Sequence, residues 1–213
     1  MKSFALAATA LLAAATPVLA ELPAARSWEI GPVIRGRNYS LNMAPRPSQV
    51  PDGVRINLPY PDRSARHVHY VTFPYGSLEG KRRIVMRYRI DAPPGTRFVP
   101  QEYPDREAVL SLYFQRRGDT WTARGPYETY RWYSPASTVV PLAPGEHVIV
   151  ADLNDEWVSV LGKTRSMRPA EFAEALAGTA RIGFTLGTLK DGRGHGVFAT
   201  RPATLTVTSF EIL

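Results

Sequence analysis

The chain has 213 residues, a formal net charge of +7 at neutral pH, and no cysteine. The missing cysteines exclude disulfide bonds and a thiol nucleophile, so a secreted domain of this length has to be stabilised by its own hydrophobic core. The basic balance favours anionic partners such as acidic polysaccharides or envelope phosphates, although it also serves simply to keep a protein soluble.

The N-terminus has the pattern of a cleavable secretory signal peptide. Lys2 precedes an Ala- and Leu-rich run at 4–15, and Val18 and Ala20 form a small-x-small site, so we predict cleavage after Ala20. The run is too short to span the ~30 Å hydrocarbon core of a membrane as a helix, and no later stretch is apolar enough. The mature part keeps 25 basic and 19 acidic side chains, because residues 1–20 contain one lysine and no acid.

The Ala-rich leader and the absence of cysteine together indicate an exported bacterial protein, periplasmic or secreted. We expect no transmembrane segment after signal cleavage. Nucleic acid is not an expected partner in that compartment, whereas envelope glycans are. The sequence does not indicate an oligomeric state.

From residue 28 onward, short segments of alternating apolar and polar residues are separated by turns. The 16 glycines and 19 prolines are spread evenly, which favours turns between strands over a linker between domains. Period-two alternation is typical of antiparallel strands with one buried face. The clearest predicted strands span 54–58, 67–73, 83–90, 108–116, 147–153, 180–187 and 204–213.

One helix is predicted, at 169–177. Pro169 suits its first turn, and Gly178 ends it. A single helix among many strands predicts an all-β protein, an antiparallel β-sandwich or jelly roll, with residues 21–213 forming one domain.

Three C-terminal segments share a residue pattern with the last strands of a known family. They are RIGFTLG at 181–187, GHGVF at 194–198 and TLTVTSFEIL at 204–213. Together with Trp157, they resemble the last strands of bacterial carbohydrate-binding modules of the galactose-binding-like jelly-roll type. The resemblance covers the C-terminal third, and it implies a jelly-roll fold and a carbohydrate ligand.

The resemblance also raises the question of a metal ion. Many of these modules hold a structural calcium between carboxylates of the first and last strands. Only Glu29 and Glu211 are available here, and two carboxylates are few for an ion that takes six to eight oxygen ligands. We therefore predict no cofactor, with a structural calcium as the alternative.

Two predicted strands carry polar side chains suited to sugar recognition. Arg87 and Arg89 share one face of their strand, and Tyr113 and Gln115 share one face of theirs. If these strands are neighbours, the four side chains form one patch outside a sheet. Aromatic rings stack on sugar C–H groups, and Arg and Gln hydrogen-bond to hydroxyls and carboxylates. The alternative is a solvated face whose charges discourage edge pairing.

Two further segments supply candidate ligand contacts. In the aromatic segment 127–133, strand alternation places Arg131 and Tyr133 on one side together with Tyr127. His195 stands between two glycines in a predicted loop, where it is suited to reach a bound ligand as an acid or a base.

Other chemical motifs fail. His67 and His69 share one strand face at metal-ligand spacing, but no third ligand stands nearby, so we predict no metal site. The Gly162-Lys163-Thr164 run lacks the first glycine of a phosphate-binding loop, and no Gly-x-Ser-x-Gly motif is present.

These observations predict a β-sandwich that binds carbohydrate or another anionic envelope glycan without catalysis. The predicted ligand-binding residues are Arg87, Arg89, Tyr113, Gln115, Arg131, Tyr133 and His195. One alternative is a lyase acting on an acidic polysaccharide, with Arg87 or Gln115 neutralising a uronate and Tyr113 or His195 moving the proton. Another alternative is an envelope domain that binds a protein partner.

Overall fold

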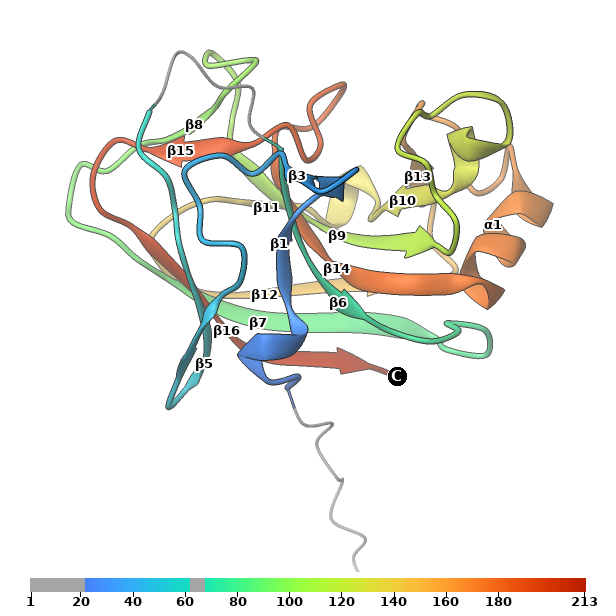
Figure 1. Ribbon diagram of the computed structural model, residues 1–213, viewed down its shortest axis with the longest axis horizontal. Coiled ribbons are helices and arrows are strands. Elements are labelled where there is room, and N and C mark those ends of the chain that lie inside the picture. The colour runs from blue at the N-terminus through green and yellow to red at the C-terminus, as the bar shows by residue number, and fades with distance from the viewer. Residues whose placement is uncertain (1–21, 62–67) are drawn as a thin grey trace, which may run out of the picture.

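The computed structural model describes residues 22–61 and 68–213. Two antiparallel sheets pack face to face, and two small two-stranded ladders accompany them (Figure 1). The described part contains sixteen strands and one α-helix, which confirms the predicted all-β sandwich. No helix within these residues is long and apolar enough to cross a membrane.

The first layer is a seven-stranded sheet. Its strands in spatial order are β1 (Glu29–Gly31), β6 (His69–Pro74), β14 (Thr179–Gly187), β9 (Val109–Arg116), β10 (Arg131–Tyr133) and β13 (Val158–Ser159), and β11 (Val140–Pro141) pairs with β9 off this path.

The second layer is a five-stranded sheet. Its order is β12 (Gly145–Asp152), β7 (Arg83–Asp91), β16 (Thr204–Ile212), β5 (Gly53–Asn57) and β4 (Ser48–Val50). The small ladders are β15 (Val197–Ala199) with β8 (Phe98–Pro100), and β2 (Val33–Ile34) with β3 (Arg37–Asn38).

Each of the seven predicted strands coincides with an observed strand, although residue 67 lies outside the described part. The predicted helix is α1 (Pro169–Ala177), and it ends where the Gly178 amide donates to carbonyls of the last turn. Three 3₁₀ turns complete the fold: η1 (Ala25–Ser27), η2 (Gly125–Thr129) and η3 (Ala136–Thr138).

The core lies between the two sheets, where the apolar faces of their strands meet. Trp28 is 1% exposed and joins the layers. Its ring centroid lies 4.5 Å from that of Phe73 on β6 and 6.0 Å from that of Phe210 on β16. Strand alternation predicts that Ile84 and Met86 of β7 and Leu112 of β9 face inward, and all three are buried in this core. The other face of β9 is buried as well.

The condition for a single polar patch, that strands 83–90 and 108–116 are neighbours, is not met. β7 lies between β12 and β16, whereas β9 lies between β14 and β10 in the other sheet. Arg87 and Arg89 therefore lie on the outer face of the five-stranded sheet. Alternation predicts which face of a strand is buried, but both strands have the same period, so it does not select their partners.

The prediction of strand alternation throughout 127–133 is also wrong. The chain forms η2 up to Thr129, and only Arg131–Tyr133 joins the sheet as β10. Pro126 stands in the first turn of η2, after Gly125 with a φ of 56°. Proline at this position favours a helical turn and removes a donor that a sheet ladder would need.

Candidate functional site

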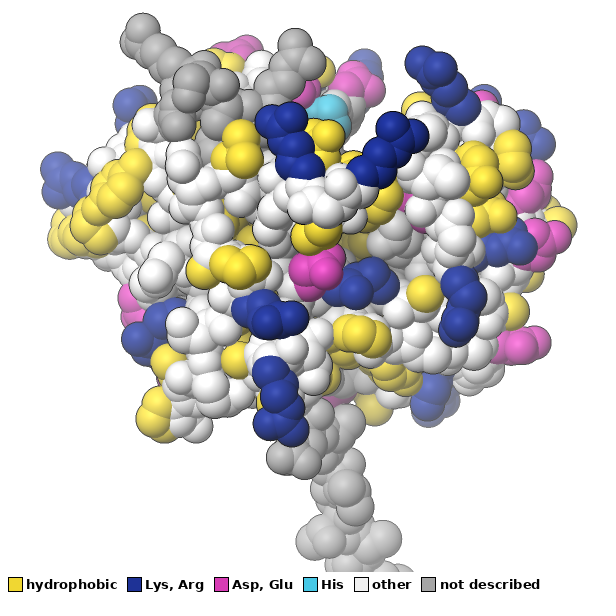
Figure 2. Space-filling view, in the orientation of Figure 1, with side chains coloured by type: hydrophobic (Ala, Val, Ile, Leu, Met, Phe, Trp, Pro, Cys, Tyr) yellow, Lys and Arg dark blue, Asp and Glu magenta, His cyan; other side chains and the backbone are white. Residues whose placement is uncertain are grey.

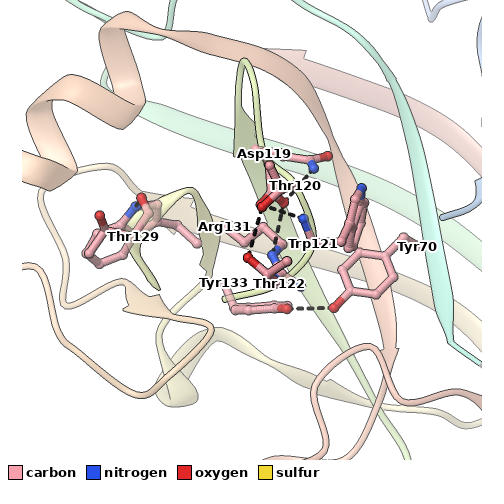
Figure 3. A network of polar contacts seen from close by, with 10 residues as sticks. Tyr70, Asp119, Thr120, Trp121, Thr122, Thr129, Arg131 and Tyr133 are labelled. Atoms are coloured by element: carbon pink, nitrogen blue, oxygen red, sulfur yellow. Dashed lines mark hydrogen bonds and ion pairs between the residues drawn. The ribbon is translucent and has the colours of Figure 1, made fainter. Parts of the chain in front are cut away.

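A second buried cluster lies on the outer face of the seven-stranded sheet, where a solvated surface was the simplest expectation. It consists of Tyr70, Tyr113 and Tyr133, at most 5% exposed, and we call it the tyrosine cluster. The hydroxyls of Tyr70 and Tyr133 lie 2.6 Å apart (Figure 3). Burial raises the pKa of Tyr113 and of Tyr133 well above the ordinary phenol value. These hydroxyls therefore stay protonated at neutral pH.

A buried ion pair supports this cluster. The Arg131 Nε atom lies 3.0 Å from Asp119 Oδ2, and the two side chains are 7% and 0% exposed. Gln115 donates a hydrogen bond of 2.8 Å from Nε2 to the same carboxylate oxygen. The Arg131 guanidinium also lies 4.9 Å from the centroid of the Trp121 ring (Figure 3). Asp119 thereby ties the loop after β9 to the sheet.

Two loops seal the tyrosine cluster. Trp121 packs edge-on against Tyr70, with centroids 5.1 Å apart. On another side, the carbonyl of Gly194 accepts a hydrogen bond of 2.9 Å from the His69 amide. A Cβ atom at Gly194 would lie 2.6 Å from the Tyr70 ring, and its φ is +77°. The loop between β14 and β15 therefore approaches the ring as closely as a glycine allows.

The Gly194→Ala variant is expected to lose about 1–3 kcal/mol of unfolding free energy, because the new methyl group meets the Tyr70 ring and the backbone is left-handed. Urea unfolding measures the loss. Gly76→Ala is the matched control, since nothing lies within 4 Å of its added Cβ. Equal stability of the two variants would contradict this close packing.

A pocket of about 770 Å³ opens beside the tyrosine cluster, and we call it the Arg193 pocket. Its lining combines an apolar wall with charged groups from the loop after β14. The lining residues are Tyr133, Ala136, Val158, Ser159, Val160, Leu161, Gly162, Leu189, Lys190, Asp191, Arg193 and His195. Elsewhere on the molecule, Lys and Arg side chains are spread over much of the face seen in Figure 2.

Arg193 is the distinctive charge of this pocket. It is half-buried, and its Nη1 atom donates to the carbonyl of Ser134. Burial lowers the pKa of its guanidinium. No carboxylate of the described residues forms an ion pair with Arg193, although Asp191 also lines the pocket. Partial burial of a cation without a counter-ion is unfavourable, and an anion that pairs with it removes this cost.

His195 lies at the same pocket, paired with a carboxylate. Its Nδ1 atom lies 2.6 Å from Glu102 Oε2, and the side chains are 40% and 46% exposed. The two residues are 93 positions apart, and the ladder of β8 with β15 brings their loops together. The sequence could not predict the role of Glu102, because no pattern in the residues around it indicates that it lies beside His195.

The predicted ligand-binding residues thus divide into three places. Tyr113, Gln115 and Arg131 lie beneath the loops, with Gln115 and Arg131 engaged by Asp119. Tyr133 and His195 line the Arg193 pocket.

Arg87 and Arg89 belong to the opposite sheet, and neither lines the Arg193 pocket. Arg89 is held by Asp52 and Asp91 at 2.9 and 3.0 Å, and Arg87 is exposed. The single patch expected from the sequence is therefore not formed.

The carboxylates considered for calcium also lie apart. Glu29 is on β1, 3.6 Å from Arg181, and Glu211 is on β16 in the other sheet, where Ser209 donates to it. His67 of the histidine pair lies outside the described residues.

No family model, no curated protein and no solved structure matches the chain. The resemblance to carbohydrate-binding modules consequently stays a prediction, and any function has to be argued from the geometry of the site.

Proposed function

We propose that the protein binds an anionic saccharide in the Arg193 pocket, with a carboxylate of the sugar paired to the Arg193 guanidinium. The observation that carries this proposal is that Arg193 is half-buried, faces the pocket and has no ion pair in the described part of the chain. Lys190 adds a second cation, so the lining carries two cations, Arg193 and Lys190, and one carboxylate, Asp191. A guanidinium can donate two hydrogen bonds to the two oxygens of one carboxylate, so it binds a carboxylate more strongly than a neutral hydroxyl.

The remaining lining suits a sugar ring. Val160 and Leu161 offer aliphatic surface for the C–H faces of a sugar, and Leu161 is 51% exposed. A pocket of this volume lies within the range of small-ligand sites, which combine apolar walls with a few placed polar groups. The expected export of the chain agrees with such a ligand, because acidic glycans are abundant in the bacterial envelope.

Titration calorimetry with trigalacturonate and with neutral galactotriose tests this proposal. We expect the acidic trisaccharide to bind more tightly, and its affinity to fall as salt is added. Arg193→Gln is expected to weaken that binding by about tenfold or more, since a hydrogen bond to a charged group contributes about 1.5–3 kcal/mol. Arg87→Gln, an exposed arginine on the other sheet, is the matched control and should bind normally.

Three results would contradict the proposal. They are equal binding of the neutral and acidic trisaccharides, unchanged affinity in Arg193→Gln, and loss of binding in Arg87→Gln. A protein captured in stoichiometric amounts, with no saccharide bound by any preparation, would favour the interaction-domain alternative instead.

A further inference from the structure

We propose that the Arg193 pocket also cleaves the bound uronate chain by β-elimination, with His195 as the base and Glu102 as its positioning residue. This inference rests on the proposed function, because it needs a uronate in the pocket. It goes beyond binding by assigning a reaction and by adding Glu102, which the sequence did not indicate.

Glu102 sets the orientation of the His195 imidazole. Glu102 Oε2 lies 2.6 Å from Nδ1, so the carboxylate accepts a hydrogen bond from the Nδ1–H group and favours the tautomer with its proton on that nitrogen. The other ring nitrogen, Nε2, then carries the lone pair and acts as the acceptor of a substrate proton. The loop is held in place by two backbone hydrogen bonds: the His195 amide donates to Gly192, and the Gln101 amide donates to the Gly196 carbonyl, both at 3.1 Å.

The two buried tyrosines do not compete with His195 as the base. Tyr113 and Tyr133 are 0% and 3% exposed, and burial raises their pKa values well above the ordinary phenol value. Neither phenol is therefore available as an anion at neutral pH. His195 is 40% exposed and lines the pocket, so a bound ligand can reach its imidazole.

The transition state of this elimination carries more negative charge than the bound uronate. Removing the proton next to a carboxylate makes an enolate-like dianion, which needs cations beside the carboxylate oxygens. Arg193 and Lys190 line the same pocket as His195. The group that binds the carboxylate in the ground state is thus also placed to stabilise the charge that develops on it.

The reaction balances without a further reactant. Nε2 of His195 takes the proton from the ring carbon that carries the carboxylate. The electron pair of that C–H bond forms a double bond to the adjacent ring carbon, and the bond from this carbon to the glycosidic oxygen breaks. The leaving oxygen takes up the proton that His195 received, which restores the neutral imidazole.

The test is to incubate the protein with polygalacturonate, polymannuronate and polyguluronate. Elimination produces a double bond conjugated to a carboxylate, so ultraviolet absorbance rises together with the number of new chain ends. His195→Gln is expected to lower the rate by about 100-fold or more, the scale of general-base catalysis, while trigalacturonate still binds. Glu102→Gln should lower the rate less and should displace the pH profile.

His147→Gln is the matched control, because His147 lies on β12 in the other sheet. Unchanged absorbance with all three polymers, in a preparation that binds trigalacturonate, overturns the elimination and leaves the binding proposal intact. Absence of binding overturns both. Equal rates for wild type and His195→Gln overturn the role of His195 as the base.

Discussion

The Asp119→Ala variant is expected to lose about 3–5 kcal/mol of unfolding free energy, because removing one partner leaves a buried, unpaired charge on the other. The Arg131 side chain is only 7% exposed, and its Nη2 atom has no partner among the described residues. The variant also loses the acceptor of the Gln115 amide. Urea unfolding followed by tryptophan fluorescence measures the change.

An exposed ion pair provides the control for this experiment. Glu146 Oε1 lies 3.7 Å from Arg89, and the glutamate side chain is 70% exposed. Glu146→Ala should therefore change stability by less than about 1 kcal/mol. Similar losses in the two variants would show that Asp119 is not a buried anchor of its loop.

The Trp28→Ala variant should lose a comparable amount, about 3–5 kcal/mol, because a fully buried indole is replaced by a cavity. Trp28 contacts aromatic rings of both sheets, and its Nε1 atom donates a 2.9 Å hydrogen bond to the carbonyl of Pro23. Losing these contacts weakens the packing between the two sheets. Thermal unfolding measured by circular dichroism reports the effect as a lower melting temperature.

Met167→Ala serves as the comparison, since Met167 is 59% exposed and should change stability by no more than about 0.5 kcal/mol. If Trp28→Ala unfolded at the same temperature as Met167→Ala, Trp28 would not join the two sheets.

The sequence predicted the fold well because alternation is a local property. Ile84, Met86 and Leu112 are buried on the faces that period two assigns to them. Strand partners were not predictable in this way. β9 pairs with β14, about seventy residues further along the chain, and no local pattern distinguishes that partner from β7.

The site was predictable only in part, and for a related reason. Tyr133 and His195, which line the Arg193 pocket, were selected from the sequence because aromatic and glycine-flanked residues stand out locally. Tyr70 and Asp119 were missed, since an ordinary tyrosine in a strand and an aspartate in a turn become significant only when two loops fold over the sheet. The burial of Tyr113 likewise depends on those loops and not on the polarity of its own strand.

The position of a bound saccharide tests the central claim most directly. A crystal structure of the His195→Gln variant with trigalacturonate would give that position without turnover. We predict a carboxylate oxygen at hydrogen-bonding distance, about 3 Å, from a guanidinium nitrogen of Arg193, with a sugar ring against Leu161. An ordered sugar beside Arg87 and Arg89, on the outer face of the five-stranded sheet, would contradict the account.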